Sequence, residues 1–110
     1  MTVSLEDFKK IEIRAGKILT AERVLASEKL VKLHVSFGEQ GERQIIAGIA
    51  PYFEDVSVLV GKKVAFAFNL EPRTLMGLES QGMVLGVGGG ENPFSLLLVG
   101  DSVPEGSLVR

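Results

Sequence analysis

The chain has 110 residues, of which 45% are hydrophobic, and a formal net charge of -2. This length supports one complete hydrophobic core and is too short for two, so we expect a single domain over residues 1–110, with a core of about residues 7–100 and a C-terminal extension over 93–110. The absence of cysteine excludes disulfides and thiolate metal sites. Since no apolar run reaches membrane-spanning length, we predict a cytoplasmic protein with no membrane partner.

Charge is unevenly distributed along the chain. Residues 1–63 hold ten of the twelve Lys and Arg residues and nine of the fourteen acidic ones, whereas residues 64–110 hold Arg73 and Arg110 against five acids. A nucleic-acid surface depends on Lys and Arg contacts to phosphates. Any such surface is therefore expected to come mainly from the first half, with Arg73 added from the second.

Two-residue periodicity predicts strands in the first half of the chain. Residues 11–19 (IEIRAGKIL) alternate apolar and polar side chains until Gly16, where we expect a bulge or a strong bend in a long curved strand. Residues 30–37 (LVKLHVSF) alternate throughout, as a half-buried strand does. The glycines and charges of residues 38–42 predict a turn into a third strand at 43–49.

The second half is expected to contain one short helix and further strands. Residues 52–61 (YFEDVSVLVG) are the only plausible helix, one or two turns long, because three β-branched valines weaken its helix propensity. Strands are predicted at residues 62–68, 83–87 and 93–99. This order predicts an all-β fold, a five-stranded OB-type barrel with one short helix between strands 3 and 4 and a C-terminal extension.

Residue types suited to catalysis or metal binding are scarce. His34 is the only histidine and lies on the polar face of a predicted strand, so we expect a solvated or packed strand residue. Without a second histidine or any cysteine, no metal site is expected. Residues 86–91 (GVGGGE) begin like a dinucleotide fingerprint but have no helix after them, which favours a hairpin turn. We therefore predict a protein that is not an enzyme and uses no cofactor.

A polar, glycine-punctuated insert, residues 69–83 (NLEPRTLMGLESQGM), separates two apolar strands. Taken alone, it is typical of a structural loop whose methionines fill core gaps. The ordered combination of Asn69, Pro72–Arg73, Gly77 and Ser80–Met83 resembles the tRNA-binding domain family. This OB-fold module occurs as stand-alone structure-specific tRNA-binding proteins and as the C-terminal domain or β subunit of methionyl-tRNA synthetases. The similarity runs over nearly the whole chain, from EDFKKIEIRAGKI near the start to VPEGSLVR at the end.

The resemblance implies a groove beside the insert that binds the tRNA outer corner or acceptor-stem region by shape. The implied contacts are five residues of the insert and four basic residues of the first half: Asn69, Arg73, Ser80, Gln81, Met83, Lys29, Lys32, Arg14 and Arg43. Of the basic four, Lys29 and Lys32 would supply phosphate contacts, and the two arginines are weaker candidates. Family members commonly carry Lys where this chain has Glu71 and Thr74, so we expect weaker and more salt-sensitive tRNA binding.

The same resemblance implies partners and leaves two other functions open. A homodimer is expected, joined through the N-terminal segment and the region after the barrel, with methionyl-tRNA synthetase as a candidate partner. The apolar run at residues 96–99 suits such an interface, and the alternative is that it covers its own barrel. The other functions are a dimeric peptide-binding chaperone, from a secretion-related branch with the same fold, and a bare scaffold. The intact GLESQGM pattern favours tRNA binding over the chaperone.

Overall fold

The computed structural model describes all residues, 1–110, and its secondary structure is mostly β. The helix and strands, in chain order, are α1 (Leu5–Phe8), β1 (Ile13–Arg23), β2 (Val31–Ser36), β3 (Glu42–Ala47), β4 (Lys63–Ala67), β5 (Arg73–Leu75), β6 (Leu78–Ser80), β7 (Met83–Val84), β8 (Gly86–Gly88) and β9 (Phe94–Leu96). Three short 3-10 turns complete the structure: η1 (Gly38–Gln40), η2 (Ala50–Tyr52) and η3 (Val56–Leu59).

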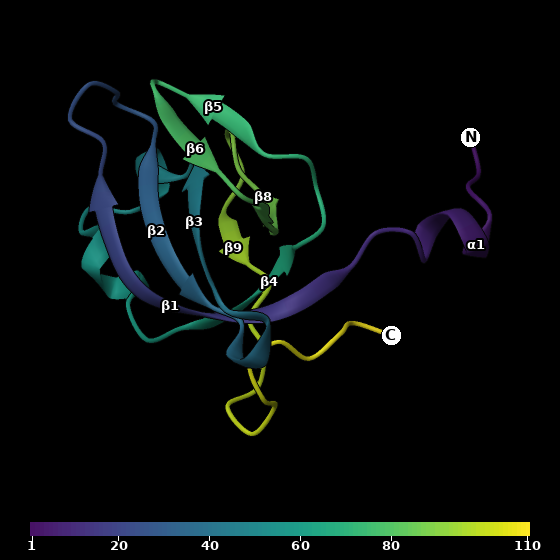
Figure 1. Ribbon diagram of the computed structural model, residues 1–110. Helices are drawn as coiled ribbons and strands as arrows, with labels where there is room; N and C mark the ends of the chain where they lie inside the picture. Colours follow the sequence, from purple (N-terminus) through teal and green to yellow (C-terminus); the bar gives the residue numbers. More distant parts are fainter.

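The main sheet contains five antiparallel strands in the order β3, β2, β1, β4, β7. The long strand β1 stands at its centre: residues 17–23 pair with β2, and residues 13–17 pair with β4. Because β2 and β4 pair with different halves of β1, the sheet curls around its interior, as Figure 1 shows. This curled five-stranded sheet confirms the predicted all-β fold and is consistent with an OB-type barrel.

Apolar side chains fill the inside of the curl. The alternation predicted for residues 30–37 is confirmed, because Val31, Leu33 and Val35 are buried while His34 is exposed. The rings of Phe37 and Phe66 meet edge to face, with their centroids 5.4 Å apart. Two-residue periodicity was therefore sufficient to identify the core face of β2.

Gly16 in β1 has a different role from the predicted bulge. A Cβ added at this position would lie 2.6–2.9 Å from side-chain atoms of Val35, Phe37 and Phe66. Glycine thus lets the core side chains approach the backbone of β1 closely. The irregularity in strand pairing lies further along, between Ile18 and Thr20.

The connection between β3 and β4 contains η2 and η3 in place of the predicted helix. Asp55 caps η3, and hydrogen bonds from the side chain and backbone of Ser57 lower the pKa of the Asp55 carboxyl. The β-branched valines around this turn disfavour a longer helix. The only α-helix, α1, lies before the barrel and buries none of its residues. No helix in the structure has both the length and the apolar character needed to span a bilayer.

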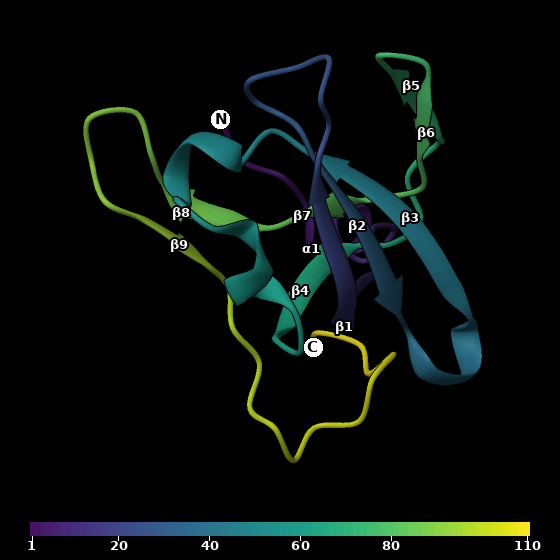
Figure 2. The ribbon, with the colours of Figure 1, turned by 90° about the vertical axis from the view of Figure 1, so that its left-hand side faces the viewer.

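The insert folds as a separate hairpin of β5 and β6, in which Arg73 pairs with Ser80 and Leu75 with Leu78. Figures 1 and 2 show the tip of this hairpin at the same end of the barrel as the loop between β1 and β2. OB-type folds bind nucleic acids with the corresponding two loops and the sheet face between them. The fold therefore gathers the insert and the loop that carries Lys29 at one end.

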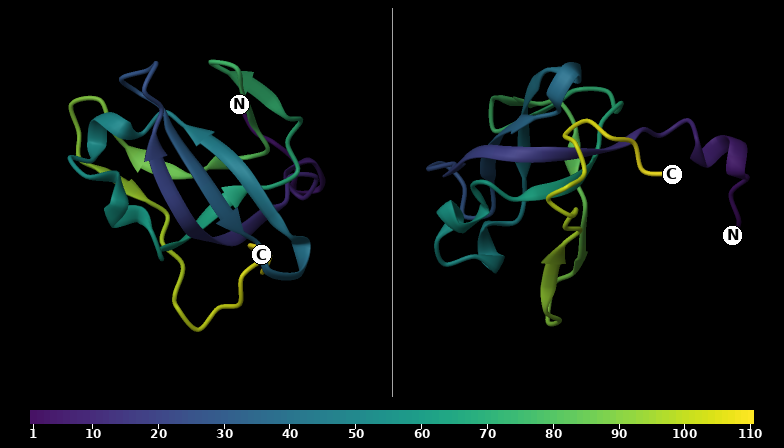
Figure 3. Two further views of the ribbon diagram at one scale, coloured as in Figure 1. Left: turned by 60° about the vertical axis from the view of Figure 1, so that its left-hand side comes forward. Right: turned by 90° about the horizontal axis from the view of Figure 1, so that it is seen from below.

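The C-terminal segment returns to β1 after β9. The Ala15 N–H donates to the Ser107 carbonyl, and the Val109 N–H donates to the Ile13 carbonyl. In Figure 3 the N-terminal segment and the C-terminal tail leave the barrel on the same side. The apolar run at residues 96–99 is divided, since Leu96 is buried in the barrel core while Leu98 is exposed.

Candidate functional site

A small groove lies between the β5–β6 hairpin and the barrel. Its volume is about 60 Å³, and its lining comes from β3, the insert and the start of β7: Ile46, Leu70, Glu71, Arg73, Leu75, Ser80, Gly82 and Met83. Three of the predicted contacts, Arg73, Ser80 and Met83, line it. The structure thus brings these three residues onto one surface.

Ser80 and Gln81 fasten the hairpin to the barrel through their side chains. The buried Ser80 Oγ accepts a hydrogen bond from the Ile46 N–H at 2.9 Å and donates one to the Gly82 carbonyl at 3.0 Å. Gln81 Oε1 accepts from the Gln44 N–H at 3.1 Å, and the Gln81 N–H donates to the Gln44 carbonyl at 2.8 Å. Because these groups satisfy the backbone of β3 at the edge of the sheet, they close the barrel there.

Arg43 joins the two ends of the insert. Its Nη1 donates to the Phe68 carbonyl and, at 3.2 Å, to the Gln81 carbonyl. Its guanidinium carbon lies 3.5 Å from the centroid of the Phe68 ring, so the planar group also stacks on that ring. The side chain is therefore engaged within the protein at the base of the insert.

Asn69 and Arg14 hold the N-terminal segment against the barrel. Asn69 Oδ1 accepts from the Glu12 N–H at 2.7 Å, and Asn69 Nδ2 donates to the Lys10 carbonyl at 2.7 Å. Arg14 makes a salt bridge of 2.9 Å with the Glu12 carboxylate. The structure places both residues at the junction between β1, β4 and the insert, away from the lining of the groove. Direct contact of either residue with tRNA stays a prediction.

Three predicted phosphate contacts, Arg73, Lys29 and Lys32, remain accessible to solvent. Arg73 and Lys29 are exposed, and the side chain of neither makes an ion pair or a hydrogen bond. Lys32 lies 3.8 Å from the Glu22 carboxylate in a solvent-exposed ion pair, which stabilises the fold little. The Cα partner of Lys32 on β3 is Ile46, which lines the groove. Positive charge thus borders the groove on the β2 side and on the hairpin itself.

Sequence reasoning missed the turn at the tip of the hairpin. Met76 and Gly77 connect β5 to β6, and both have positive φ, of 51° and 79°. A two-residue turn of this kind favours Asn-Gly or Asp-Gly, so Met-Gly gave no hairpin signal. Met76 is 59% exposed and Met83 48% exposed, so neither methionine fills a core gap. The interpretation of the insert as a loop whose methionines fill such gaps is therefore wrong.

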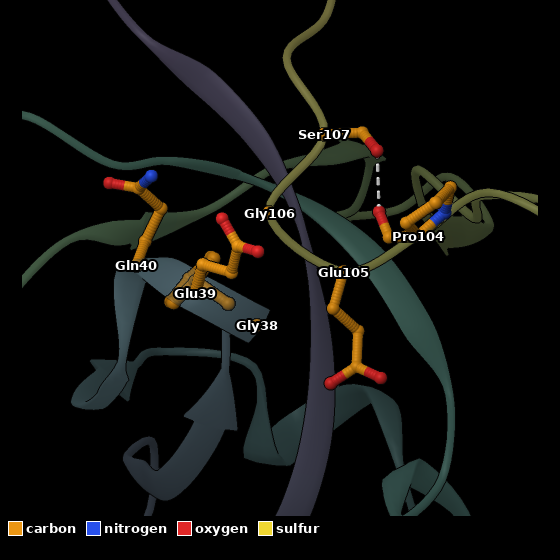
Figure 4. A pocket seen from close by; sticks show the side chains of 8 residues that line it. Gly38, Glu39, Gln40, Pro104, Glu105, Gly106 and Ser107 are labelled. Carbon is orange, nitrogen blue, oxygen red and sulfur yellow. Dashed lines mark hydrogen bonds between the residues drawn. The ribbon is translucent and has the colours of Figure 1, made fainter.

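The largest cavity lies elsewhere and has the wrong charge for a phosphate. It measures about 530 Å³ and opens between η1 and the C-terminal turn, as Figure 4 shows. Its charged side chains are the carboxylates of Glu39 and Glu105, and no Lys, Arg or His lines it. The groove beside the hairpin therefore remains the candidate site.

Known proteins resemble this chain in sequence over almost its whole length. Methionine–tRNA ligase of Caldanaerobacter subterraneus subsp. tengcongensis is 42% identical over 107 residues, and that of Methanospirillum hungatei is 45% identical over 108 residues. These alignments cover 97% and 98% of this chain, which spans only 16% of the length of each relative.

Solved structures share the fold. A MetRS related protein from Pyrococcus horikoshii is 34% identical with a TM-score of 0.92, over 100% of this chain and 99% of that one. The chaperone CsaA from Bacillus anthracis is 25% identical with a TM-score of 0.88, over 100% of both chains. The sequence model of the family described as "Putative tRNA binding domain" matches residues 13–108. Because that match covers most of the chain, the protein belongs to this tRNA-binding domain family.

Proposed function

We propose that this chain is a non-catalytic tRNA-binding module that acts in trans in the cytoplasm. The observation that carries the proposal is the exposed, unpaired Arg73 on the wall of the groove, in a chain that belongs to this family. The relatives named methionine–tRNA ligase support a role beside such an enzyme, as a subunit that raises its affinity for tRNA.

The predicted contacts have different proposed roles. Arg73 offers a planar fork to a phosphate, and Lys29 and Lys32 offer point charges on the neighbouring loop and strand. The exposed thioether of Met83 covers the apolar surface of a ribose or base. Ser80, Gln81 and Arg43 set the position of the hairpin on the barrel. Asn69 and Arg14 hold the N-terminal segment beside it.

Filter binding of the purified protein to bulk tRNA across a salt series tests the role of Arg73. Arg73→Ala removes one phosphate contact, so it is expected to weaken binding and to lower the slope of log affinity against log salt by about one. Lys62→Ala is the control, because it removes the same charge from an exposed position before β4. If Arg73→Ala keeps the affinity and slope of the unchanged protein, Arg73 does not bind phosphate.

We also propose that the chain forms a homodimer through its two terminal segments. Leu5, Phe8, Ile11, Leu108 and Val109 are all exposed, and they line a cavity of about 480 Å³ between α1 and the C-terminal tail. Contiguous exposed apolar surface of this kind is typical of an interaction site. A second copy would cover the helix that buries nothing in its own chain.

Sedimentation equilibrium measures this dimer. Phe8→Asp places a charge in the apolar surface, so it is expected to shift the protein to a monomer at micromolar concentration. Leu25→Asp introduces the same charge at a fully exposed position in the β1–β2 loop and should leave the mass unchanged. A dimer that persists in Phe8→Asp would place the interface elsewhere.

A chaperone function is the second candidate, and the structural likeness to CsaA favours it. It predicts that the protein keeps an unfolded client soluble while retaining no tRNA. Light scattering of a heated client, run beside the filter-binding series, separates the two functions. Retention of tRNA with no protection of the client supports the tRNA-binding function.

A further inference from the structure

The groove beside the hairpin carries a carboxylate that phosphate binding alone does not explain. Glu71 lines the groove together with Arg73, two residues away, yet both side chains are exposed and they form no ion pair with each other or with any other residue. A carboxylate repels a phosphate, so it weakens any site that binds only the RNA backbone. Glu71 is therefore available as a hydrogen-bond acceptor.

Part of the groove lining is apolar and exposed. Half of its lining residues are hydrophobic, and two of these, Leu70 and Met83, are 40% and 48% exposed. The faces of paired bases are covered by their neighbours in a helix, whereas an unpaired base presents a flat apolar face to a protein. Exposed apolar side chains beside an arginine therefore suit an unpaired nucleotide, with its base on Leu70 and Met83 and its phosphate on Arg73.

The free carboxylate discriminates among the four bases. Its two oxygens accept two parallel hydrogen bonds, and guanine is the base whose Watson–Crick edge presents two adjacent donors, N1–H and the N2 amino group. Adenine and cytosine each present one amino donor beside an acceptor nitrogen. Uracil presents one donor between two carbonyl acceptors, which the carboxylate repels.

We propose that the groove binds one unpaired guanine of an RNA, with the Glu71 carboxylate accepting from guanine N1–H and N2–H. Met83 and Leu70 contact the face of the base, and Arg73 binds an adjacent phosphate. The volume of about 60 Å³ admits the edge of a base while the rest of the ring lies on the exposed thioether. The proposal rests on the tRNA-binding function and adds the nucleotide that the site selects.

Competition against labelled tRNA tests the proposal with short RNAs. The competitors are uridine octamers with a single central guanosine, inosine or adenosine; inosine differs from guanosine only in lacking the 2-amino group. The guanosine octamer is expected to compete at least roughly tenfold better than the inosine octamer, because one hydrogen bond to a charged acceptor is lost. The adenosine octamer is expected to compete no better than the inosine octamer.

Glu71→Gln is the decisive variant, because it keeps the shape of the side chain and removes its charge and one acceptor oxygen. It is expected to bring the ratio of guanosine to inosine competition close to one. Glu79→Gln is the matched control, since Glu79 lies in the same hairpin, is exposed and does not line the groove. It should leave the ratio unchanged.

The outcomes separate this proposal from the proposed function. If tRNA is bound but the three octamers compete equally or fail to compete, the guanine site is wrong and tRNA binding stands. A preference for guanosine that survives in Glu71→Gln also overturns the role of Glu71. If no tRNA is retained even at low salt, the proposed function fails, and the guanine site fails with it.

Discussion

At the scale of single residues, the arginines of this protein differ in whether their side chains bind within the protein or remain free. Arg43 is engaged by two backbone carbonyls and an aromatic ring, whereas Arg73 is exposed and free of partners. Both were predicted from the sequence as tRNA contacts, because a sequence shows the residue type and not what surrounds it. The difference between them lies in tertiary neighbours up to 38 residues away along the chain.

Arg43→Lys tests whether the planar guanidinium holds the insert. Lysine keeps the charge but cannot stack on Phe68 and donate to two carbonyls together, so unfolding in urea is expected to require about 1–2 kcal/mol less free energy. Arg73→Lys makes the same change at an exposed site and should not alter stability. Equal stability of both variants would show that the Arg43 contacts do not stabilise the fold.

At the scale of elements, the β5–β6 hairpin is the part that the sequence described least well. Its two strands have only three residues each, and its turn places Met76 in the left-handed region that asparagine and glycine prefer. The turn therefore carries a local conformational cost at an exposed position.

Substitutions at the two turn positions are expected to change stability in opposite directions. Met76→Asn relieves the cost of a positive φ and should stabilise the protein by about 0.5–1 kcal/mol. Gly77→Ala forces a Cβ into a φ of 79° and should destabilise it by a similar amount. Thermal unfolding followed by circular dichroism measures both. A decrease in stability for Met76→Asn would mean that Met76 makes contacts that outweigh its strain.

The elements that the sequence predicted well are those with local signals. Strands β1 and β2 followed from two-residue periodicity, β3 from the turn before it, β4 from its apolar run, and the β8–β9 hairpin from its glycines. The closure of the barrel could not be predicted in this way, because it depends on Ser80 and Gln81 meeting β3 more than thirty residues away in sequence. The predicted helix is a 3-10 turn in the structure, because the β-branched valines of this segment disfavour a longer helix.

At the scale of the whole molecule, two glycines allow the C-terminal turn to pack closely against η1. A Cβ on Gly106 would lie 2.3 Å from the Phe37 carbonyl oxygen, and a Cβ on Gly38 would lie 2.6 Å from the Glu105 carbonyl oxygen. Both contacts are with backbone, which cannot move aside as a flexible side chain can. The tail that contributes to the proposed dimer surface therefore depends on this close approach.

Gly106→Ala is expected to release the C-terminal tail from β1. The added methyl group and the positive φ of 87° should together cost at least about 1–2 kcal/mol in the free energy of unfolding. Hydrogen exchange of the Ala15 amide, which donates to Ser107, should accelerate. Gly100→Ala is the control, because a Cβ there meets nothing within 4 Å. Unchanged exchange in Gly106→Ala would show that the tail accommodates the methyl group.

The way in which the hairpin is attached also makes the protein a scaffold for engineering. The insert is hydrogen-bonded to the rest of the molecule through Asn69, Glu79, Ser80 and Gln81, and Met83 pairs with Ala67 of β4, whereas residues 70–78 make no such bond. A library that varies residues 70–78 and keeps these attachments intact would alter the proposed binding surface without removing a hydrogen bond that closes the barrel. Selection from such a library against folded RNAs would yield binders of new specificity on an unchanged core.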